Sequence, residues 1–230
     1  MANYDKTILC LANSRRPGGT CFAGKELIGS KLAGWIRPVN SAHQGAISAQ
    51  DRLYNGGSHA ELLDKVTVTL QKPAPHLHHQ EDHQIDASKY WVKISRATWN
   101  EVVNATDIVK GELWVNDDSS WHGQNDKVSE ASASKLKGSL YLIEPTNLKL
   151  VVGWESVYQG PDIRRVRAEF EYNNISYNFV VTDEPVEKTY FAKDDGTYPA
   201  KNVRLCISLA EIKHGNAIKL VAAVITPDRV

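Results

Sequence analysis

Apolar residues occur along this chain in short runs or in alternation with polar residues, and both patterns predict β-strands. Residues 7–12 and 140–143 are short apolar runs, and residues 66–70 alternate as Val-Thr-Val-Thr-Leu. Glycine, proline, asparagine and aspartate separate these segments and predict turns between them. The last expected strand is almost entirely apolar, so we expect it to be central in its sheet. Further strands are expected at residues 20–23, 34–39, 90–94, 149–154, 203–209 and 220–225.

Residues 165–181 form the clearest predicted element, an antiparallel hairpin. Asn173 and Asn174 fit a two-residue turn between its strands. We interpret the charged face of the first strand as exposed to solvent and paired across strands. Strict alternation gives that strand an apolar face (Val166, Ala168, Phe170 and Tyr172) and a charged face (Arg165, Arg167, Glu169 and Glu171).

Helical patterns are confined to short segments. Thr98 and Glu101 have the spacing of a capping box before an apolar pair, which predicts one short helix. Asp183 either caps a second helix that begins at Glu184 or lies at the rim of a site. Strands do not alternate with long helices, so the chain is predicted to be mostly β, a barrel or sandwich with one or two short helices.

The polar segment 116–137 is the candidate linker between two halves of the chain. It contains Asp, Ser, Gly and Asn throughout, which is typical of a loop. A chain of 230 residues is long enough for two small domains, each with its own core. We therefore expect an N-terminal domain with long loops over residues 1–130 and a C-terminal domain over residues 131–230.

The composition argues against several classes of protein. The 27 basic and 27 acidic residues cancel, so nucleic-acid binding would require a local basic patch rather than bulk charge. The cysteines Cys10, Cys21 and Cys206 are odd in number and form no CxxC pair, which argues against a disulfide framework and structural zinc. No secretion signal is evident, and the longest apolar run, 220–225, is too short to span a bilayer. We therefore expect a cytoplasmic protein without a membrane partner.

The histidine-rich segment 76–83 is where metal-ligand side chains gather. It lacks the fixed spacing of a zinc site, so we favour a solvated loop that titrates between about pH 5 and 7. No metal and no cofactor is predicted, and the sequence leaves metal binding by this loop open. The residues concerned are His76, His78, His79, Glu81, Asp82 and His83.

No known catalytic motif is present, whether G-x-S-x-G, H-E-x-x-H or Walker A. Cys10 and Cys206 lie in apolar strands and are expected in the core. Cys21 lies near a loop and is the remaining candidate nucleophile, which would need a histidine brought to it by the fold. We assign no catalytic residue, and the sequence leaves open whether the protein is an enzyme.

A loop with two arginines, residues 14–19, is the strongest candidate binding element. Clustered cations on a glycine-rich loop have no obvious packing role. Single-strand binding needs such cations and flat rings for base stacking, and Trp35, Trp91 or Trp121 could supply a ring. The alternative is that Trp35 is a core residue and Arg37 pairs with a carboxylate. The candidate nucleic-acid-binding residues are Ser14, Arg15, Arg16, Lys25, Trp35 and Arg37.

Distinctive motifs occur in both halves of the chain. The first half contains ILCLANSRRPGGTCFAGKEL and GWIRPVN, with Ser14-Arg15, Gly19, Cys21 and Ala23-Gly24 as matching features. The second half contains SLYLIEP, FVVTD and VRLCISLAEIKHGNAIKLVAAVI. In these motifs the chain resembles the bacterial dual-OB-domain proteins. The resemblance implies two small OB-like barrels and a nucleic-acid-binding role within bacterial conflict or defence systems.

Three functional hypotheses follow. The first is a module that binds single-stranded DNA or RNA near the 14–19 loop and Arg37. The second is a protein-interaction adaptor subunit for an effector enzyme, which a net charge of zero favours. The third is a small-molecule or nucleotide sensor, or an enzyme, with a pocket, because OB barrels also bind oligosaccharides and proteins.

Overall fold

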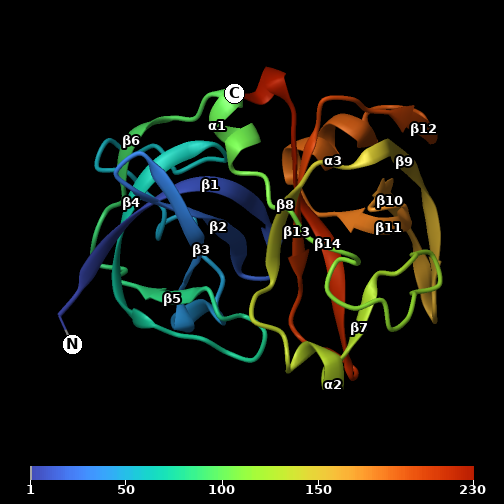
Figure 1. Cartoon of the computed structure of the whole chain (residues 1–230), viewed down its shortest axis with the longest axis horizontal. Helices are drawn as coiled ribbons and strands as arrows, with labels where there is room; N and C mark the ends of the chain where they lie inside the picture. The colour runs from blue at the N-terminus through green and yellow to red at the C-terminus, as the bar shows by residue number, and fades with distance from the viewer. Residues whose placement is uncertain (1) are drawn as a thin grey trace. The chain divides into compact units, whose positions relative to one another are not determined.

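A computed structural model describes residues 2–230, and the chain divides into two compact units, each with its own sheet (Figure 1). Unit 1 consists of Met1–Ala105 with two short returning segments, Lys137–Ser139 and Asp228–Val230. Unit 2 consists of Thr106–Leu136 and Leu140–Pro227. The division after Ala105 differs from the boundary expected at residue 130.

Unit 1 is a closed β-barrel. The sheet order is β1-β2-β3-β5-β4, and antiparallel pairing of β4 with β1 closes the ring, while β6 extends β4. Pairing is antiparallel except between β3 and β5. The elements are β1 (Tyr4–Arg16), β2 (Gly19–Ile28), β3 (Lys31–Val39), the 3-10 helix η1 (Ser41–His43), β4 (Asp64–Pro73), β5 (Asp82–Ile85), β6 (Val92–Arg96) and α1 (Trp99–Asn104).

The core of unit 1 follows from the apolar run that the sequence places in the first strand. Residues 8–12 are completely buried, and the Phe22 ring meets Trp91 edge-on at a centroid distance of 4.9 Å. Helix α1 begins with the expected capping box, because Thr98 Oγ1 accepts from the Glu101 amide and the Glu101 carboxylate accepts from the Thr98 amide. Trp91 is only 2% exposed, so it is a core residue and has no ring face available for a ligand.

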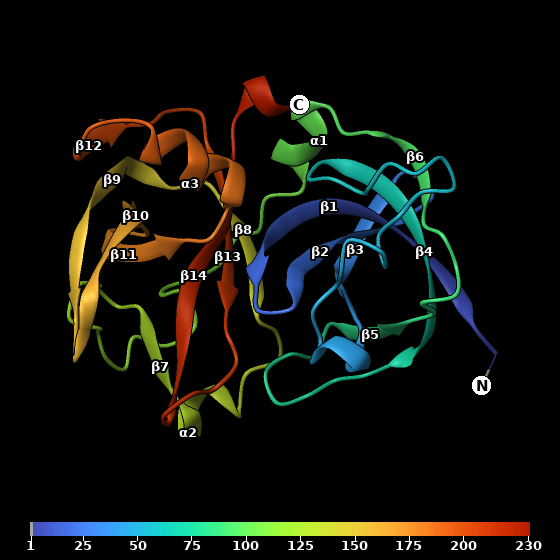
Figure 2. The same cartoon turned by 180° about the vertical axis from the view of Figure 1, so that it is seen from behind.

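Unit 2 is built on one large sheet in the order β12-β9-β10-β11-β14-β13-β8, with β7 paired to β14. As expected, the apolar strand β14 is central, between β11 and β13. Helix α3 packs against β10, and Figure 2 shows it at one end of the sheet. The elements are β7 (Lys127–Ser129), α2 (Glu130–Ala133), β8 (Leu140–Ile143), β9 (Thr146–Val157), β10 (Gly160–Tyr172), β11 (Ile175–Val181), α3 (Glu184–Phe191), β12 (Gly196–Pro199), β13 (Arg204–Leu209) and β14 (Asn216–Ile225), followed by η2 (Pro227–Arg229).

The predicted hairpin is β10–β11, turning at Asn173 and Asn174. Its apolar face is buried apart from the half-buried Tyr172, and its arginines pair across strands as expected, but the charged face is less exposed than expected. Arg167 is buried and donates from Nε to Glu155 Oε1 at 2.5 Å, across to β9. The partner of Arg167 is therefore Glu155 on β9, which lies outside the alternating segment 165–172.

The segment expected as a linker, 116–137, is instead integrated into unit 2, apart from its last residue. Strand β7 pairs with β14, and Val128 is buried in the unit 2 core. Upstream, the Leu113 amide donates to the hydroxyl of the buried Tyr177 at 3.0 Å. The side chains of this segment are mostly polar, but its backbone still pairs with the unit 2 sheet. Composition alone therefore did not show that the segment belongs to unit 2.

Asp183 occupies the N-cap position of α3, but its side chain does not cap the helix. Its Oδ2 accepts a hydrogen bond of 2.9 Å from the Val224 amide on β14, and the residue is buried. Both sequence-based alternatives, a helix cap and a site rim, are therefore replaced by a link between α3 and the central strand. No helix among residues 2–230 has the length and apolar character of a membrane span.

Candidate functional site

The arginine loop is the turn of the β1–β2 hairpin. Arg15 pairs with Thr20 and Arg16 with Gly19, and Gly18 has a φ of 86°. A Cβ at Gly19 would lie 2.3 Å from the Ile47 carbonyl oxygen, so only glycine fits this close approach. Arg15 is exposed, whereas Arg16 is half-buried and donates from Nη2 to the Gln44 carbonyl at 2.6 Å. The hairpin therefore presents one arginine to solvent beside a second that is anchored.

Lys25 and Trp35 are opposed residues of β2 and β3. Lys25 is buried, and its Nζ donates to the Ala105 carbonyl at 2.7 Å and lies 5.6 Å from the centroid of the Trp35 ring. The Lys25 amine thus fixes the C-terminal end of α1 and lies close to the Trp35 ring. Trp35 itself is half-buried, so it is neither a full core residue nor an open stacking surface.

Arg37 lies in a buried group that we call the Arg37 cluster, made up of Arg37, Glu81, Asp82 and Ser139. The side chain of Arg37 is only 3% exposed, and its Nε donates to Asp82 Oδ1 at 2.5 Å. Its Nη1 lies 3.4 Å from Ser139 Oγ, and that hydroxyl in turn donates to Glu81. Arg37 Nη2 has no hydrogen-bond acceptor among the described residues. The alternative in which Arg37 pairs with a carboxylate is the arrangement observed.

Burial and neighbouring charges shift the pKa values of Asp82 and Arg37 in this cluster. Burial raises the pKa of Asp82 to about 6, and the Arg37 charge opposes that rise. Burial also acts to lower the pKa of Arg37, but the nearby Asp82 carboxylate outweighs it, so the guanidinium remains charged. The cluster therefore changes its net charge near pH 6, as Asp82 titrates, while Arg37 stays charged.

Cys21 shares the β1–β2 pairing with the buried Ser14, directly opposite it. Burial raises the pKa of the Cys21 thiol, and the positive charge of Arg37 only partly opposes this. A thiol held in its protonated form is a poor nucleophile. The environment thus offers Cys21 no activation, and Ser14 is buried opposite it.

The two units differ in charge although the whole chain is neutral. Unit 1 contains 14 Lys and Arg against 10 Asp and Glu, a formal charge of +4. Unit 2 contains 13 against 17, a formal charge of −4. The arginine hairpin belongs to the basic unit. The argument from bulk neutrality therefore does not apply to unit 1 taken by itself.

The histidine-rich segment is not the solvated loop that its composition indicates. His78 and His79 are buried with their ring centroids 4.1 Å apart, and the His76 and His79 backbones are hydrogen-bonded to each other. His83 is half-buried against the Tyr4 hydroxyl at 2.7 Å, and burial lowers its pKa. Within residues 2–230, no group of three or more His, Cys, Asp or Glu side chains is arranged to hold a metal ion.

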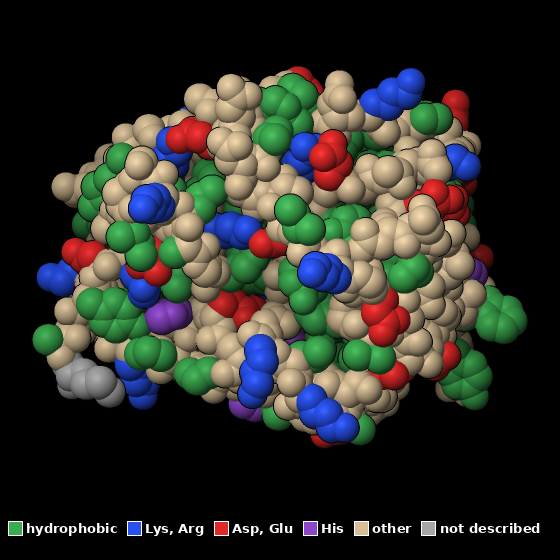
Figure 3. Space-filling model, viewed as in Figure 1, with side chains coloured by type: hydrophobic (Ala, Val, Ile, Leu, Met, Phe, Trp, Pro, Cys, Tyr) green, Lys and Arg blue, Asp and Glu red, His purple; other side chains and the backbone are tan. Residues whose placement is uncertain are grey.

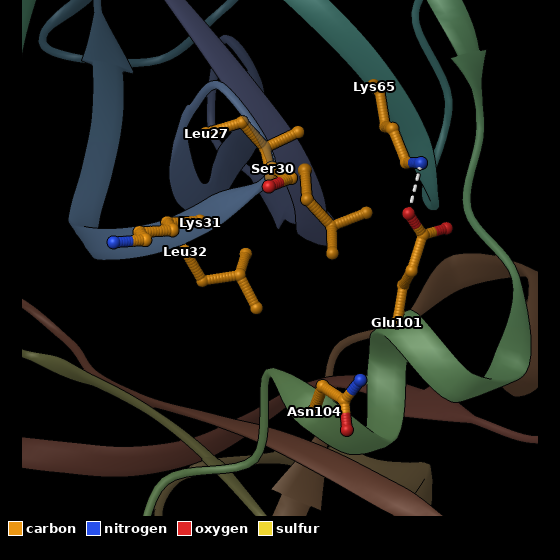
Figure 4. Close-up of a pocket in the computed structure, with 8 residues that line it drawn as sticks. Leu27, Ser30, Lys31, Leu32, Lys65, Glu101 and Asn104 are labelled. Atoms are coloured by element: carbon orange, nitrogen blue, oxygen red, sulfur yellow. Dashed lines mark hydrogen bonds and ion pairs between the residues drawn. The ribbon is translucent and has the colours of Figure 1, made fainter.

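Unit 1 also contains a cavity of about 400 Å³ between the β2–β3 hairpin and α1 (Figure 4). Leu27 and Leu32 give it an apolar wall, and Ser30 and Asn104 lie at its margin. Three charged residues line it: Lys65 Nζ donates to Glu101 Oε1 at 2.5 Å, so these two charges neutralise each other, and Lys31 is exposed. The cavity has room for a small apolar group but offers no uncompensated charge from this pair to bind an ionic ligand.

Sequence reasoning missed two of the three most exposed large aromatic rings among the described residues, Trp154 and Tyr158. Trp121, which the sequence offered as one possible stacking ring, is exposed on unit 2, and Trp154 and Tyr158 are exposed there as well. Alternation in β9 gives no sign of this exposure, because Trp154 is flanked by glycine and glutamate near the end of the strand.

Comparison with known proteins assigns the fold. No curated protein and no solved structure matches the chain. A family model described as the dual OB-containing domain matches residues 6–224, which is nearly the whole sequence. The match agrees with a mostly β chain folded as two separate β units. The chain belongs to the dual OB-containing domain family.

Proposed function

We propose that unit 1 binds single-stranded nucleic acid at the surface of the β1–β2 hairpin. The observation that carries the proposal is the charge of +4 on unit 1, together with an exposed arginine at a glycine turn. Membership of an OB family supports it, because OB barrels commonly bind oligonucleotides.

Each candidate residue takes a distinct role in this proposal. Arg15 contacts phosphate directly, and Arg16, fixed by the Gln44 carbonyl, contacts it beside the turn. The half-buried ring of Trp35 offers an edge or face to a base. Lys25 and Arg37 are buried, so they act by positioning β2, β3 and α1 rather than by touching the ligand.

Fluorescence anisotropy with labelled dT20 and rU20 tests the proposal. We expect binding that weakens between about 50 and 200 mM salt, because phosphate contacts release counterions. Arg15→Ala with Arg16→Ala should weaken binding roughly tenfold or more at low salt and reduce the salt slope by about 1.4, since each single-strand contact contributes about 0.7.

A matched control removes the same charge from the acidic unit. Arg164→Ala with Arg165→Ala deletes two arginines whose side chains pair with Asp195 and Glu155. We expect this pair to leave oligonucleotide affinity within about twofold. Equal losses in the two double variants would refute the hairpin as the site, and no binding by the wild-type protein at low salt would refute the function.

We further propose that the chain acts within a bacterial defence system beside an effector enzyme, on the strength of the family resemblance alone. Purification from the native host with an affinity tag, with and without nuclease treatment, tests this. Recovery of a stoichiometric nuclease or helicase that survives nuclease treatment would support it. Recovery of the chain alone would count against it.

A further inference from the structure

The cavity between the β2–β3 hairpin and α1 lies apart from the arginine hairpin. Strand β2 leads from the hairpin turn at Gly19 to the cavity at Leu27, a distance of roughly 25 Å at about 3.3 Å per residue. The cavity volume of about 400 Å³ falls within the range of about 300–1,000 Å³ that is usual for small-molecule pockets. The cavity therefore has room for a small organic ligand.

Strand pairing gives the cavity an apolar wall. Leu27 and Leu32 are opposed residues of β2 and β3. Leu9, which is completely buried, is opposed to Lys65 in the β1–β4 pair. Figure 4 shows Leu27 and Leu32 on one side of the cavity and α1 on the other. Because apolar side chains favour contact with hydrocarbon over contact with water, this wall favours a ligand with an aliphatic or aromatic body.

The carboxylate among the lining residues, Glu101, is already occupied. Its Oε1 accepts from Lys65 Nζ at 2.5 Å, and its Oε2 accepts from the Thr98 amide and hydroxyl at 2.9 and 3.0 Å. These hydrogen bonds, that of Lys65 first, lower the pKa of Glu101, so the carboxylate stays ionised and paired. Helix α1 therefore presents no free anion that would attract a cationic ligand.

Hydrogen-bond donors, by contrast, remain available around the cavity. The Lys65 ammonium has three N–H groups and gives one of them to Glu101. Lys31 is exposed and has no ion-pair partner among the residues that the structure describes. Figure 4 shows its amine on the opposite side of the cavity from Lys65. The Ser30 hydroxyl and the Asn104 amide add neutral donors at the margin.

The charges that line the cavity determine which ligand charge it favours. Figure 3 shows basic and acidic side chains interspersed on the face that it displays, so no broad charged patch on that face makes the choice. The lining residues carry two cations, Lys31 and Lys65, against the single anion of Glu101. The Ala105 carbonyl at the end of α1 already accepts from Lys25. The cavity thus has a positive excess and favours an anionic group.

We propose that this cavity binds a small organic monoanion, with one carboxylate or sulfonate group on an aliphatic or aromatic body. The body packs against Leu9, Leu27 and Leu32, and the anionic group lies at the mouth. There it accepts from the Ser30 hydroxyl and from the amine of Lys31, whose flexible stem lets the charge follow the ligand. The site is independent of the nucleic-acid site proposed on the β1–β2 hairpin.

Anilinonaphthalene sulfonate, whose fluorescence rises in an apolar site, serves as the probe with the full-length protein. Sodium octanoate and octylammonium chloride then compete with it. These competitors have the same chain and opposite charges, so a difference between them reports the anionic group. We expect octanoate to displace the probe at a concentration at least about tenfold lower. Octanoate should also shift the amide NMR resonances of Ser30, Lys31 and Asn104, and leave those of Gly18 and Gly19 in place.

Two kinds of variant test the two parts of the site. Lys31→Glu reverses the unpaired charge at an exposed position and should weaken octanoate binding about three- to tenfold. Lys72→Glu makes the same change at an exposed lysine of β4 that does not line the cavity, and should alter binding by less than about twofold. Leu32→Trp fills the cavity and should abolish octanoate binding. If it lowers the thermal unfolding midpoint, Asn104→Trp, at the exposed margin, repeats the blockade.

Three results would overturn the proposal. Equal displacement by octanoate and octylammonium, or equal effects of Lys31→Glu and Lys72→Glu, would refute an anionic ligand. Octanoate-induced shifts confined to residues outside the cavity would refute the site. Binding of dT20 is measured in parallel: its absence with octanoate binding retained would refute only the nucleic-acid function, and the reverse result would refute only the cavity site.

Discussion

Replacing Arg37 by methionine removes the cation that compensates two buried carboxylates. Arg37 is 3% exposed, and it lies 2.5 Å from Asp82 and 4.0 Å from Glu81. Breaking one side of a buried ion pair leaves an uncompensated charge in the protein and costs about 3–5 kcal/mol. We therefore expect Arg37→Met to reduce the free energy of unfolding of unit 1 by that amount near pH 7.5.

The cost should depend on pH. The pKa of Asp82 is raised from 3.8 to about 6 in the folded protein, so folding favours the protonated carboxyl. Stability from this group is complete below about pH 4 and is lost as pH rises through 6, by about 3 kcal/mol in total. Without the opposing charge of Arg37 the pKa rises further, so the variant protonates Asp82 more completely at pH 5. We expect the deficit of Arg37→Met to shrink by about 1–3 kcal/mol between pH 7.5 and 5.

Urea unfolding at both pH values measures the effect. Because the two units can unfold separately, hydrogen exchange at β3 and β5 amides should accompany it to report on unit 1. Lys6→Met, which removes a partly exposed pair with Glu26, is the control and should cost less than about 1 kcal/mol. Adding Asp82→Leu to Arg37→Met should recover part of the loss. A loss below about 1 kcal/mol, or one independent of pH, would refute the reasoning.

Two further predictions concern unit 2. Asp183→Ser keeps a residue able to cap α3 but removes the carboxylate that accepts from the buried Val224 amide. We therefore expect it to lower the free energy of unfolding of unit 2, measured in urea, by about 1–3 kcal/mol. An unchanged free energy of unfolding would restore the interpretation of Asp183 as a helix cap. Lys219 is fully buried with its pKa lowered from 10.5 to about 8, so its contribution is complete above about pH 10.5 and lost as pH falls through 8. Between pH 8 and 10.5, the free energy of unfolding of wild type should rise by up to about 3 kcal/mol relative to that of Lys219→Met. If the free energies of unfolding of the two proteins change with pH in parallel, this prediction is contradicted.

Local patterns in the sequence predicted most strands correctly. The 165–181 hairpin, the run at 140–143 and the apolar strand at 220–225 are all strands, and the capping box at Thr98 does begin a helix. Each depends on residues close together in the chain: alternation, a two-residue turn, or a cap three positions from its partner. The loop expected at residues 14–19 is the turn of the β1–β2 hairpin, because its glycine pair is a local signal.

Burial and pairing between distant residues were not predictable in the same way. His78 and His79 have the composition of a surface loop, yet both are buried. Arg167 pairs with Glu155, which is 12 positions away and on another strand. Such outcomes depend on which strands each sheet brings together, and this information is not present in any short window of sequence.

The sequence by itself determined that the chain is β-rich, where its strands and turns lie, and that its cysteines and motifs supply no recognisable catalytic centre. Only the tertiary structure decided that the chain passes from unit 1 to unit 2 after Ala105, with two short segments returning to unit 1, and that a neutral chain separates into units of +4 and −4. It also decided that Arg37 is buried against Asp82 while Trp121, Trp154 and Tyr158 are left in solvent. The physical reason is that alternation specifies which side chains share a face, whereas the pairing and packing of each sheet specify what each face meets.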